Sequence, residues 1–289
     1  MGATRASIFK SRRLNERIVH TLSHLLLLLG AVTTTLPLFW MVSASLMQDW
    51  ELAVYPPRWI PERLMWENYG RVFTVMPFAR FALNSVKLAV LSTVGTLLSC
   101  SLAAYSFARL RFPGRDKIFL VLLATMMIPG AVRLVPVYII FTRLGWVDTH
   151  LPLFVPSFLG GAYGIFLIRQ FYLTLPQELM DAAKIDGCNP FSTYWRIVLP
   201  LGGPVHATLG LFACMGSWNS LMGPLIYLNS TELFTLPIGL TYFRGHQWAK
   251  VDWTGLMAGC VITVLPILLL FVLTQRYFVR GIVLTGLKV

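Results

Sequence analysis

The sequence predicts an all-α integral membrane protein with six transmembrane helices. Three observations predict this class: 56% of the 289 residues are hydrophobic and only 12% are charged, several uncharged runs are long, and basic residues concentrate in alternate segments between those runs. A helix needs about 20 apolar residues to cross a bilayer, because lipid offers no partner to an unpaired backbone group. A soluble domain usually carries about 25% charged residues.

The six spans follow from the apolar runs in chain order. Four runs are uncharged throughout and the third is interrupted only by Arg133. The fifth run is also uncharged but includes LPLGGP near its start, so its span is taken to begin at Pro204. Pro129 and Gly130 predict a break within the third span. The predicted spans are 25–47, 88–108, 118–141, 151–168, 204–228 and 253–275.

The orientation follows from the distribution of Lys and Arg. If the N-terminus is cytoplasmic, the inside segments hold 15 basic and 5 acidic residues, whereas the outside segments hold 7 of each. The predicted organisation is a cytoplasmic segment 1–24, a six-helix domain 25–278 and a cytoplasmic tail 279–289. The net charge of +12 thus has a topological origin, and nucleic-acid binding is not needed to explain it.

Several classes of activity lack their motifs. The chain has no G-x-x-x-x-G-K-[ST], no H-E-x-x-H and no G-x-S-x-G, so no nucleotide site, zinc protease site or hydrolase elbow is predicted on it. The cysteines lack the C-x-x-C spacing of a metal or redox site. The predicted spans contain no Asp or Glu, and their Lys and Arg residues are limited to Arg133 and to Lys87 at the edge of the second span, which argues against a proton relay. We therefore expect neither an enzyme nor a metal protein.

A polar loop, residues 173–203, separates the fourth and fifth spans. Thr174 and Gln177 fit a capping box that begins a helix, and Gly187 suits the left-handed position that ends it. Asn189 is a good N-cap, with Pro190 at the first position of a second short helix. Each helix has an apolar face: Leu175, Leu179, Ala182 and Ala183 on the first, and Phe191, Tyr194, Trp195 and Val198 on the second. By these patterns alone, the helix pair either lies on the membrane surface or contacts another protein.

The stretch DAAKIDG, followed after nine residues by IVLP, closely resembles the E-A-A loop signature of permease subunits of ABC importers. The resemblance extends over most of the chain and is closest to the six-helix membrane component of the carbohydrate, maltose-type branch. It includes, in order, NSVKLAV, AAYSFARLRFPG, MMIPGAVRLVPVY, LIRQFYLTLPQELMDAAKIDG, SWNSLMGPLIYL and the tail RYFVRGIVLTGLKV. The family is one of the prokaryotic cell membrane.

The resemblance implies that the 173–203 loop is a coupling loop that docks on a separate cytoplasmic ATPase dimer. ATP and Mg²⁺ would bind to that ATPase, with no cofactor on this chain. The first acidic position of the motif, usually Glu, is Asp181 here, so the expected ion pair has a shorter reach. The implied docking residues are Glu178, Asp181, Ala182, Ala183, Asp186, Gly187, Phe191, Ile197 and Pro200.

The resemblance also implies import of a sugar or related polyol, with a second permease subunit, an extracytoplasmic solute-binding protein and membrane lipid as partners and no nucleic acid. Trp218 and Asn219 match a W-N position of the family and could line the solute path; the alternative is that Asn219 bonds a neighbouring helix. Arg133 faces either a cavity or the outer surface, and Lys87 either reaches the interface or the path. The alternative is an ion-coupled secondary transporter.

Overall fold

The computed structural model describes residues 3–244 and 251–286, and their side chains over 18–244 and 251–275. These residues form helices and loops, with no strand among them. Four helices are long and apolar enough to cross a membrane, and the number rises to six if each of two bent helix pairs is one span. The six-helix class predicted from the sequence is thus compatible with this fold.

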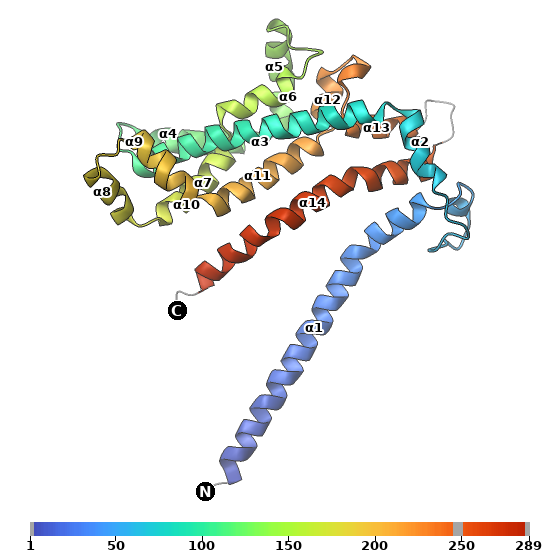
Figure 1. Ribbon diagram of the computed structural model, residues 1–289, viewed down its shortest axis with the longest axis horizontal. Helices are drawn as coiled ribbons and strands as arrows, with labels where there is room; N and C mark the ends of the chain where they lie inside the picture. Colours follow the sequence, from blue (N-terminus) through green and yellow to red (C-terminus); the bar gives the residue numbers. More distant parts are fainter. Residues whose placement is uncertain (1–2, 245–250, 287–289) are drawn as a thin grey trace. The chain divides into compact units, whose positions relative to one another are not determined.

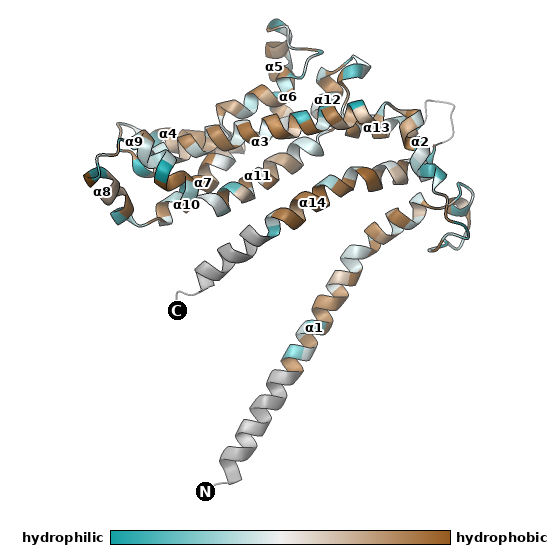
Figure 2. Ribbon diagram, viewed as in Figure 1, coloured by the Kyte–Doolittle hydropathy of each residue, from teal (hydrophilic) through white to brown (hydrophobic). Residues whose placement is uncertain are grey.

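The chain divides into two compact units, residues 1–72 with 243–261 and residues 73–242 with 262–289. The first contains α1 (Ala3–Ser45), a short 3-10 turn (Glu51–Ala53) and most of α2 (Glu67–Val75). The helix α14 (Trp253–Gly286) begins in the first unit and continues in the second. In Figure 2 hydrophobic residues predominate along the described part of α14.

In the first unit a buried carboxylate organises the loop after α1. Glu51 is 1% exposed, and its two carboxylate oxygens accept hydrogen bonds from the backbone N–H of Gln48 at 2.7 Å and of Glu62 at 2.9 Å. The side-chain amide of Asn68 donates to the carbonyls of Ser45 and Met47 at the end of α1. These side chains supply the hydrogen bonds that backbone groups of this Pro-rich loop would otherwise make to water.

The second unit is built around α3 (Phe78–Arg109), α7 (Ala162–Thr174) and α11 (Gly203–Trp218), which run side by side in Figure 1. The short elements α8 (Gln177–Ile185), α9 (Pro190–Thr193) and α10 (Leu199–Leu201) lie at the end of the unit where α3 ends. At its other end lie α12 (Met222–Tyr227) and α13 (Leu236–Thr241), with the 3-10 turn Thr231–Leu233 between them. A further 3-10 turn, Tyr242–Arg244, begins at the last residue of this segment and continues in the first unit.

Three of the predicted spans are broken rather than continuous. The third divides into α4 (Arg115–Ala124), followed by the 3-10 turn Thr125–Met127, and α5 (Gly130–Arg143), which are bent by 100° at Pro129 as predicted. The fourth contains α6 (Leu151–Phe154) and a 3-10 turn (Val155–Leu159) before Gly160, which has a φ of +83°. The fifth stops at Trp218 and resumes as α12.

The core of the second unit depends on close approach of α7 to its neighbours. A Cβ added to Gly164 would lie 2.8 Å from the sulfur of Cys100 on α3 and 3.0 Å from a methyl of Leu209 on α11. A hydrogen bond of 2.9 Å between the Tyr172 hydroxyl and His206 Nε2 also joins α7 to α11. Gly164 therefore marks a site of tight helix packing, whereas Gly160, four residues earlier, lies before α7 begins.

Gly164→Val should lower the free energy of unfolding by about 1–3 kcal/mol, because the added methyl groups overpack this contact. The thermal unfolding midpoint of the detergent-solubilised protein measures the effect. Gly161→Ala is the matched control, since a Cβ at Gly161 meets nothing within 4 Å. An equal loss in the two variants would contradict the packing explanation.

In the second unit a carboxylate connects the loop before α6 with the loop after α12. Asp148, whose φ is +59°, accepts hydrogen bonds from the backbone N–H of Asn229 at 2.9 Å and of Ser230 at 2.8 Å. Its own N–H donates to the carbonyl of Tyr227 at 2.7 Å. The Ser230 hydroxyl and these two N–H groups lower the pKa of Asp148 below its ordinary value.

Because the pKa of Asp148 is lower in the folded state, its contribution to stability is present above the unfolded pKa of about 3.9 and is lost as pH falls through the folded value. Asp148→Asn should therefore lower the unfolding midpoint slightly at pH 7, and the difference from wild type should shrink below about pH 4. Thermal unfolding at both pH values measures this. A difference that does not depend on pH would show that the charge of Asp148 contributes nothing.

Candidate functional site

The first arm of the 173–203 loop is α8, and it begins at Gln177 rather than at the predicted N-cap, Thr174. The Thr174 hydroxyl donates to the carbonyl of Phe171 at 2.7 Å and so completes α7. Leu175 is extended, with ψ of 140°, because the ring of Pro176 disfavours helical geometry in the residue before it. The predicted capping box is therefore wrong, and Pro176 separates two helices.

The turn between the two arms agrees with the prediction. Gly187 has a φ of +77°, its N–H donates to the carbonyl of Lys184 at 3.1 Å, and the N–H of Cys188 donates to that of Ala183 at 2.9 Å. This pair of bonds is a Schellman motif, in which glycine takes the left-handed position without steric cost. The turn thus has a defined geometry that follows from Gly187.

The second arm starts as predicted and then changes its helical pitch. The Asn189 side chain accepts from the N–H of Ser192 at 2.8 Å and caps α9, which begins at Pro190. The next five residues, Tyr194–Val198, form a π-helical turn that leads into α10. A π turn shifts the faces of a helix relative to α-helical spacing.

This shift divides the apolar face predicted for the second arm. Tyr194 is 1% exposed and its hydroxyl lies 2.7 Å from the Ser101 hydroxyl on α3, and Val198 is also buried. Phe191 and Trp195 are 66% and 53% exposed, with stacked rings whose centroids are 6.4 Å apart. Two residues of the face therefore anchor the arm, and two remain on its surface.

The face predicted for the first arm is also divided. Met180 and Ala183 are buried, whereas Ala182 and Leu179 are exposed. The small side chain of Ala183 lets α8 approach the rest of the unit, so Ala183 faces inward instead of lining an outer surface. Of the other implied docking residues, Ile197 is half-buried, and the exposed ones are Glu178, Asp181, Ala182, Asp186, Gly187, Phe191 and Pro200.

Arg109, at the last turn of α3, fastens the loop to the transmembrane helices. Its guanidinium donates to the carbonyls of Tyr172 and Leu175 at the end of α7, the second at 2.5 Å, and to the side-chain oxygen of Gln177 on α8 at 3.0 Å. An arginine suits this position because its planar fork can reach several acceptors at once. The stretch AAYSFARLRFPG contains Arg109, but its local pattern does not show which carbonyls the side chain would reach.

An open cleft of about 430 Å³ lies beside this junction, and Arg109, Gln177, Asp181, Lys184 and Cys188 are among the residues that line it. The Gln177 amide also donates to the Asp181 carboxylate at 3.2 Å. Asp181 is therefore held toward the start of its own helix while remaining exposed.

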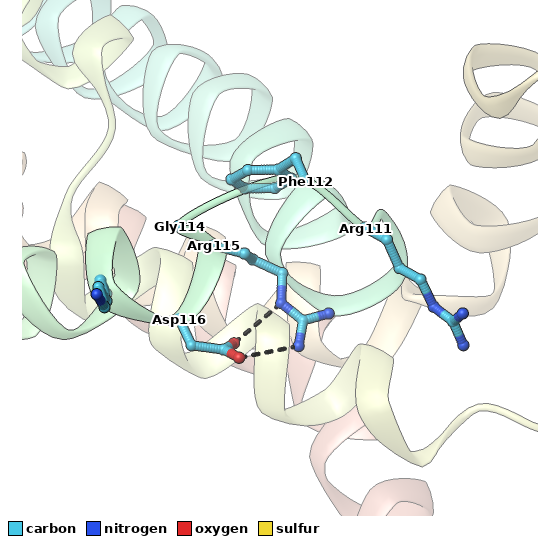
Figure 3. Close-up of a pocket in the computed structure, with 6 residues that line it drawn as sticks. Arg111, Phe112, Gly114, Arg115 and Asp116 are labelled. Carbon is cyan, nitrogen blue, oxygen red and sulfur yellow. Dashed lines mark hydrogen bonds and ion pairs between the residues drawn. The ribbon is translucent and has the colours of Figure 1, made fainter.

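The neighbouring loop, between α3 and α4, carries several basic residues. In Figure 3 the Arg115 guanidinium pairs with Asp116, with an Nε to Oδ1 distance of 2.9 Å, while Arg111 extends away from this pair. Gly114 has a φ of +77° at the turn into α4. Together with Lys117 these residues border an open hollow on the loop.

The residues predicted for a solute path do not come together. Trp218 is 5% exposed, and its indole N–H donates to the carbonyl of Thr263 on α14 at 3.2 Å, so its ring belongs to helix packing. Asn219 is exposed at the end of α11, and Arg133 is exposed on α5. Lys87 lies 3.4 Å from Nδ1 of His150. A path-lining role for Asn219 or Arg133 stays a prediction.

Within the described residues, no group of three or more His, Cys, Asp or Glu side chains could hold a metal ion.

Residues 95–284 match the family described as binding-protein-dependent transport system inner membrane component. The chain is 36% identical over 230 residues to the arabinooligosaccharides transport system permease protein AraQ of Halalkalibacterium halodurans, which covers 79% of this chain and 81% of that protein. It is 33% identical over 275 residues to the sn-glycerol-3-phosphate transport system permease protein UgpE of Pectobacterium atrosepticum, covering 93% of this chain and 98% of that protein.

Among solved structures, the fold is similar to a chain of a bacterial ABC transporter involved in the import of the acidic polysaccharide alginate. The TM-score is 0.80 at 21% identity, and the alignment covers 91% of this chain and 98% of that one. A second structure, of the alginate ABC transporter in complex with an alginate pentasaccharide-bound periplasmic protein, aligns with a TM-score of 0.59 at 14% identity, covering 90% of this chain and 95% of that one.

Proposed function

This chain belongs to the family of inner membrane components of binding-protein-dependent transport systems. From that premise we propose that it forms part of an importer for a sugar or related polyol. We also propose that the ATPase of this importer docks on the 173–203 loop. The chain is a multi-pass permease subunit of an ABC importer rather than an enzyme, as the resemblance of its motifs implied.

The observation that carries the docking proposal is the construction of the loop. Two short arms meet at a defined turn on Gly187, and Tyr194 and Val198 anchor the second arm in the core. The same arm exposes the stacked rings of Phe191 and Trp195, and the first arm exposes Ile185, at 87%. Exposed aromatic residues on a rigid support are typical of the centre of a protein interface.

Charge favours a protein partner over the membrane surface. Helices that lie on a bilayer are rich in Lys and Arg on their polar face, because the cytoplasmic leaflet is negative. The first arm and its turn instead expose three carboxylates, on Glu178, Asp181 and Asp186, against the single basic residue Lys184. A basic cleft on an ATPase would complement this surface.

The proposed class of solute comes from the relatives, which are named for arabinooligosaccharides and sn-glycerol 3-phosphate. The proposed partners are a second permease subunit, a cytoplasmic ATPase dimer that holds ATP and Mg²⁺, and an extracytoplasmic solute-binding protein. In this arrangement the N- and C-termini lie in the cytoplasm, and the basic segments face the ATPase side.

Uptake into vesicles tests the proposed function. The complete complex is reconstituted with ATP inside and its binding protein outside, and arabinose, arabinotriose, maltose, glycerol and sn-glycerol 3-phosphate are supplied in turn. We expect uptake of at least one solute, stimulation of ATP hydrolysis by that solute, and no uptake with a non-hydrolysable ATP analogue. Uptake driven by a proton or sodium gradient without ATP would instead support the secondary transporter.

A further inference from the structure

A small, half-open cavity in the second unit combines several hydroxyl groups with a larger apolar surface. It lies between α3, the segment of α6 and its following 3-10 turn, α11 and α12, and its volume is about 250 Å³. Hydroxyls of five side chains border it, from Ser92, Thr96, Ser157, Ser217 and Ser220. Apolar surface comes from residues such as Leu88 and Pro224, and no charged residue is among those that line the cavity.

The cavity lies where two spans lose their helical backbone. The fourth span breaks at Gly160, three residues after Ser157, and the fifth breaks at Asn219, between Ser217 and Ser220. Irregular backbone within a membrane is tolerated only where it is buried in protein or borders a water-filled space. Discontinuous helices of this kind form the solute sites of many transporters.

Two of the five cavity hydroxyls are bonded within the chain, because Ser92 donates to the carbonyl of Leu153 at 3.4 Å and Ser157 to that of Phe154 at 2.6 Å. The other three differ from typical helix hydroxyls. On α3 the Ser99 hydroxyl donates to the carbonyl of Gly95 at 2.7 Å, and on α11 the Thr208 hydroxyl donates to that of Pro204 at 2.9 Å. Within the described part of the chain, no such bond is made by the hydroxyls of Thr96, Ser217 or Ser220. These three residues are half-buried, so their hydroxyls are accessible to water or to a solute in the cavity.

We propose that this cavity binds a neutral polyhydroxylated group, either one sugar ring or a small polyol, during its passage. Each lining hydroxyl can both donate and accept, which matches the hydroxyls of such a solute, and the apolar residues can contact its ring carbons. The volume lies just below the range of about 300–1,000 Å³ that is typical of ligand pockets, so one ring fits and a longer chain would pass ring by ring. This inference rests on the proposed function and specifies where the solute is contacted.

Protection of an introduced cysteine tests the site in the complete complex. Ser217→Cys is made after the native cysteines, Cys100, Cys188, Cys214 and Cys260, are replaced by serine or alanine. The rate of labelling by a small water-soluble methanethiosulfonate is measured with and without whichever of the five solutes the wild-type complex transports. Thr208→Cys on the same helix is the control.

We expect Cys at position 217 to be labelled and the transported solute to slow its labelling, with no solute effect at position 208. If the solute does not slow labelling, the cavity is accessible to water but does not bind the solute, and the proposal is overturned. Absence of labelling would overturn it as well, because the partner permease would then cover the hydroxyls.

Substitutions separate this proposal from the proposed function. Thr96→Val and Ser217→Ala each remove one hydroxyl and should raise the solute concentration for half-maximal protection of a neighbouring Ser220→Cys by about 2–10-fold, the effect of one hydrogen bond. Gly216→Leu should abolish uptake, since a Cβ at Gly216 enters open space beside the cavity. Ser106→Ala, whose hydroxyl bonds its own helix, is the control.

If the wild-type complex transports none of the five solutes, the proposed function fails. If it transports one, and the Thr96, Ser217 and Gly216 variants bind and transport that solute as wild type does, only the cavity assignment fails.

Discussion

Gly187→Val should uncouple ATP hydrolysis from solute uptake while leaving the membrane helices assembled. Valine is β-branched and cannot take the φ of +77° at this position without strain, so the Schellman turn should open and the two arms should lose their fixed angle. We expect at least about a tenfold fall in solute transported per ATP hydrolysed, which corresponds to a loss of about 1.4 kcal/mol in coupling.

Two variants control for general strain. Gly114→Val places the same residue at a φ of +77° in the neighbouring loop, so it carries a similar backbone cost outside the proposed docking surface. Gly187→Asn should retain most activity, because Asn tolerates the left-handed region. Normal uptake and normal solute-stimulated ATP hydrolysis in Gly187→Val would rule out the role assigned to this turn.

Arg109→Met should weaken the connection between α3 and the 173–203 loop. Methionine has a similar length but no donor, so the carbonyls of Tyr172 and Leu175 and the side chain of Gln177 lose their shared partner. Hydrogen bonds from a charged group contribute about 1.5–3 kcal/mol each, and we expect the unfolding midpoint and the uptake rate both to fall, uptake by at least about tenfold.

The informative measurement for Arg109 is the ratio of solute transported to ATP hydrolysed. A purely structural role would lower the amount of folded complex but leave this ratio unchanged in the fraction that folds, whereas loss of the mechanical connection lowers the ratio. Arg111→Met is the matched control, because Arg111 lies two residues after Arg109, in the loop that follows α3, and makes no hydrogen bond or ion pair in the described structure. Arg109→Lys should be intermediate, since an ammonium lacks the planar fork.

Local patterns predicted much of the 173–203 loop correctly. Asn189 as an N-cap, Pro190 as a helix start and Gly187 as a left-handed turn all depend on interactions within four or five residues. The predicted cap at Thr174 was wrong because two local rules conflicted. The helix-start pattern favoured Thr174, but Pro176 imposed an extended conformation on Leu175.

The faces of the two arms could not be predicted from spacing alone. The π turn at Tyr194–Val198 changes the rotation per residue, and the contact of Tyr194 with Ser101 depends on a helix more than 90 residues earlier in the chain. The same limit applies to Trp218, for which the family resemblance suggested a place on the solute path, but whose indole N–H bonds the carbonyl of Thr263 on α14. Burial depends on neighbours that are distant in sequence.

By itself the sequence determined that this protein crosses a membrane, where most of its spans lie, and how the turn at Gly187 is built. These properties depend on apolar runs and on backbone preferences, which act over a few residues. Only the tertiary structure decided which side chains of the loop remain exposed, that Arg109 joins three helices, and that five hydroxyls from distant segments surround one cavity. Those features arise from packing between helices. The direction of a side chain determines its burial and its hydrogen-bond partners only when another helix lies beside it.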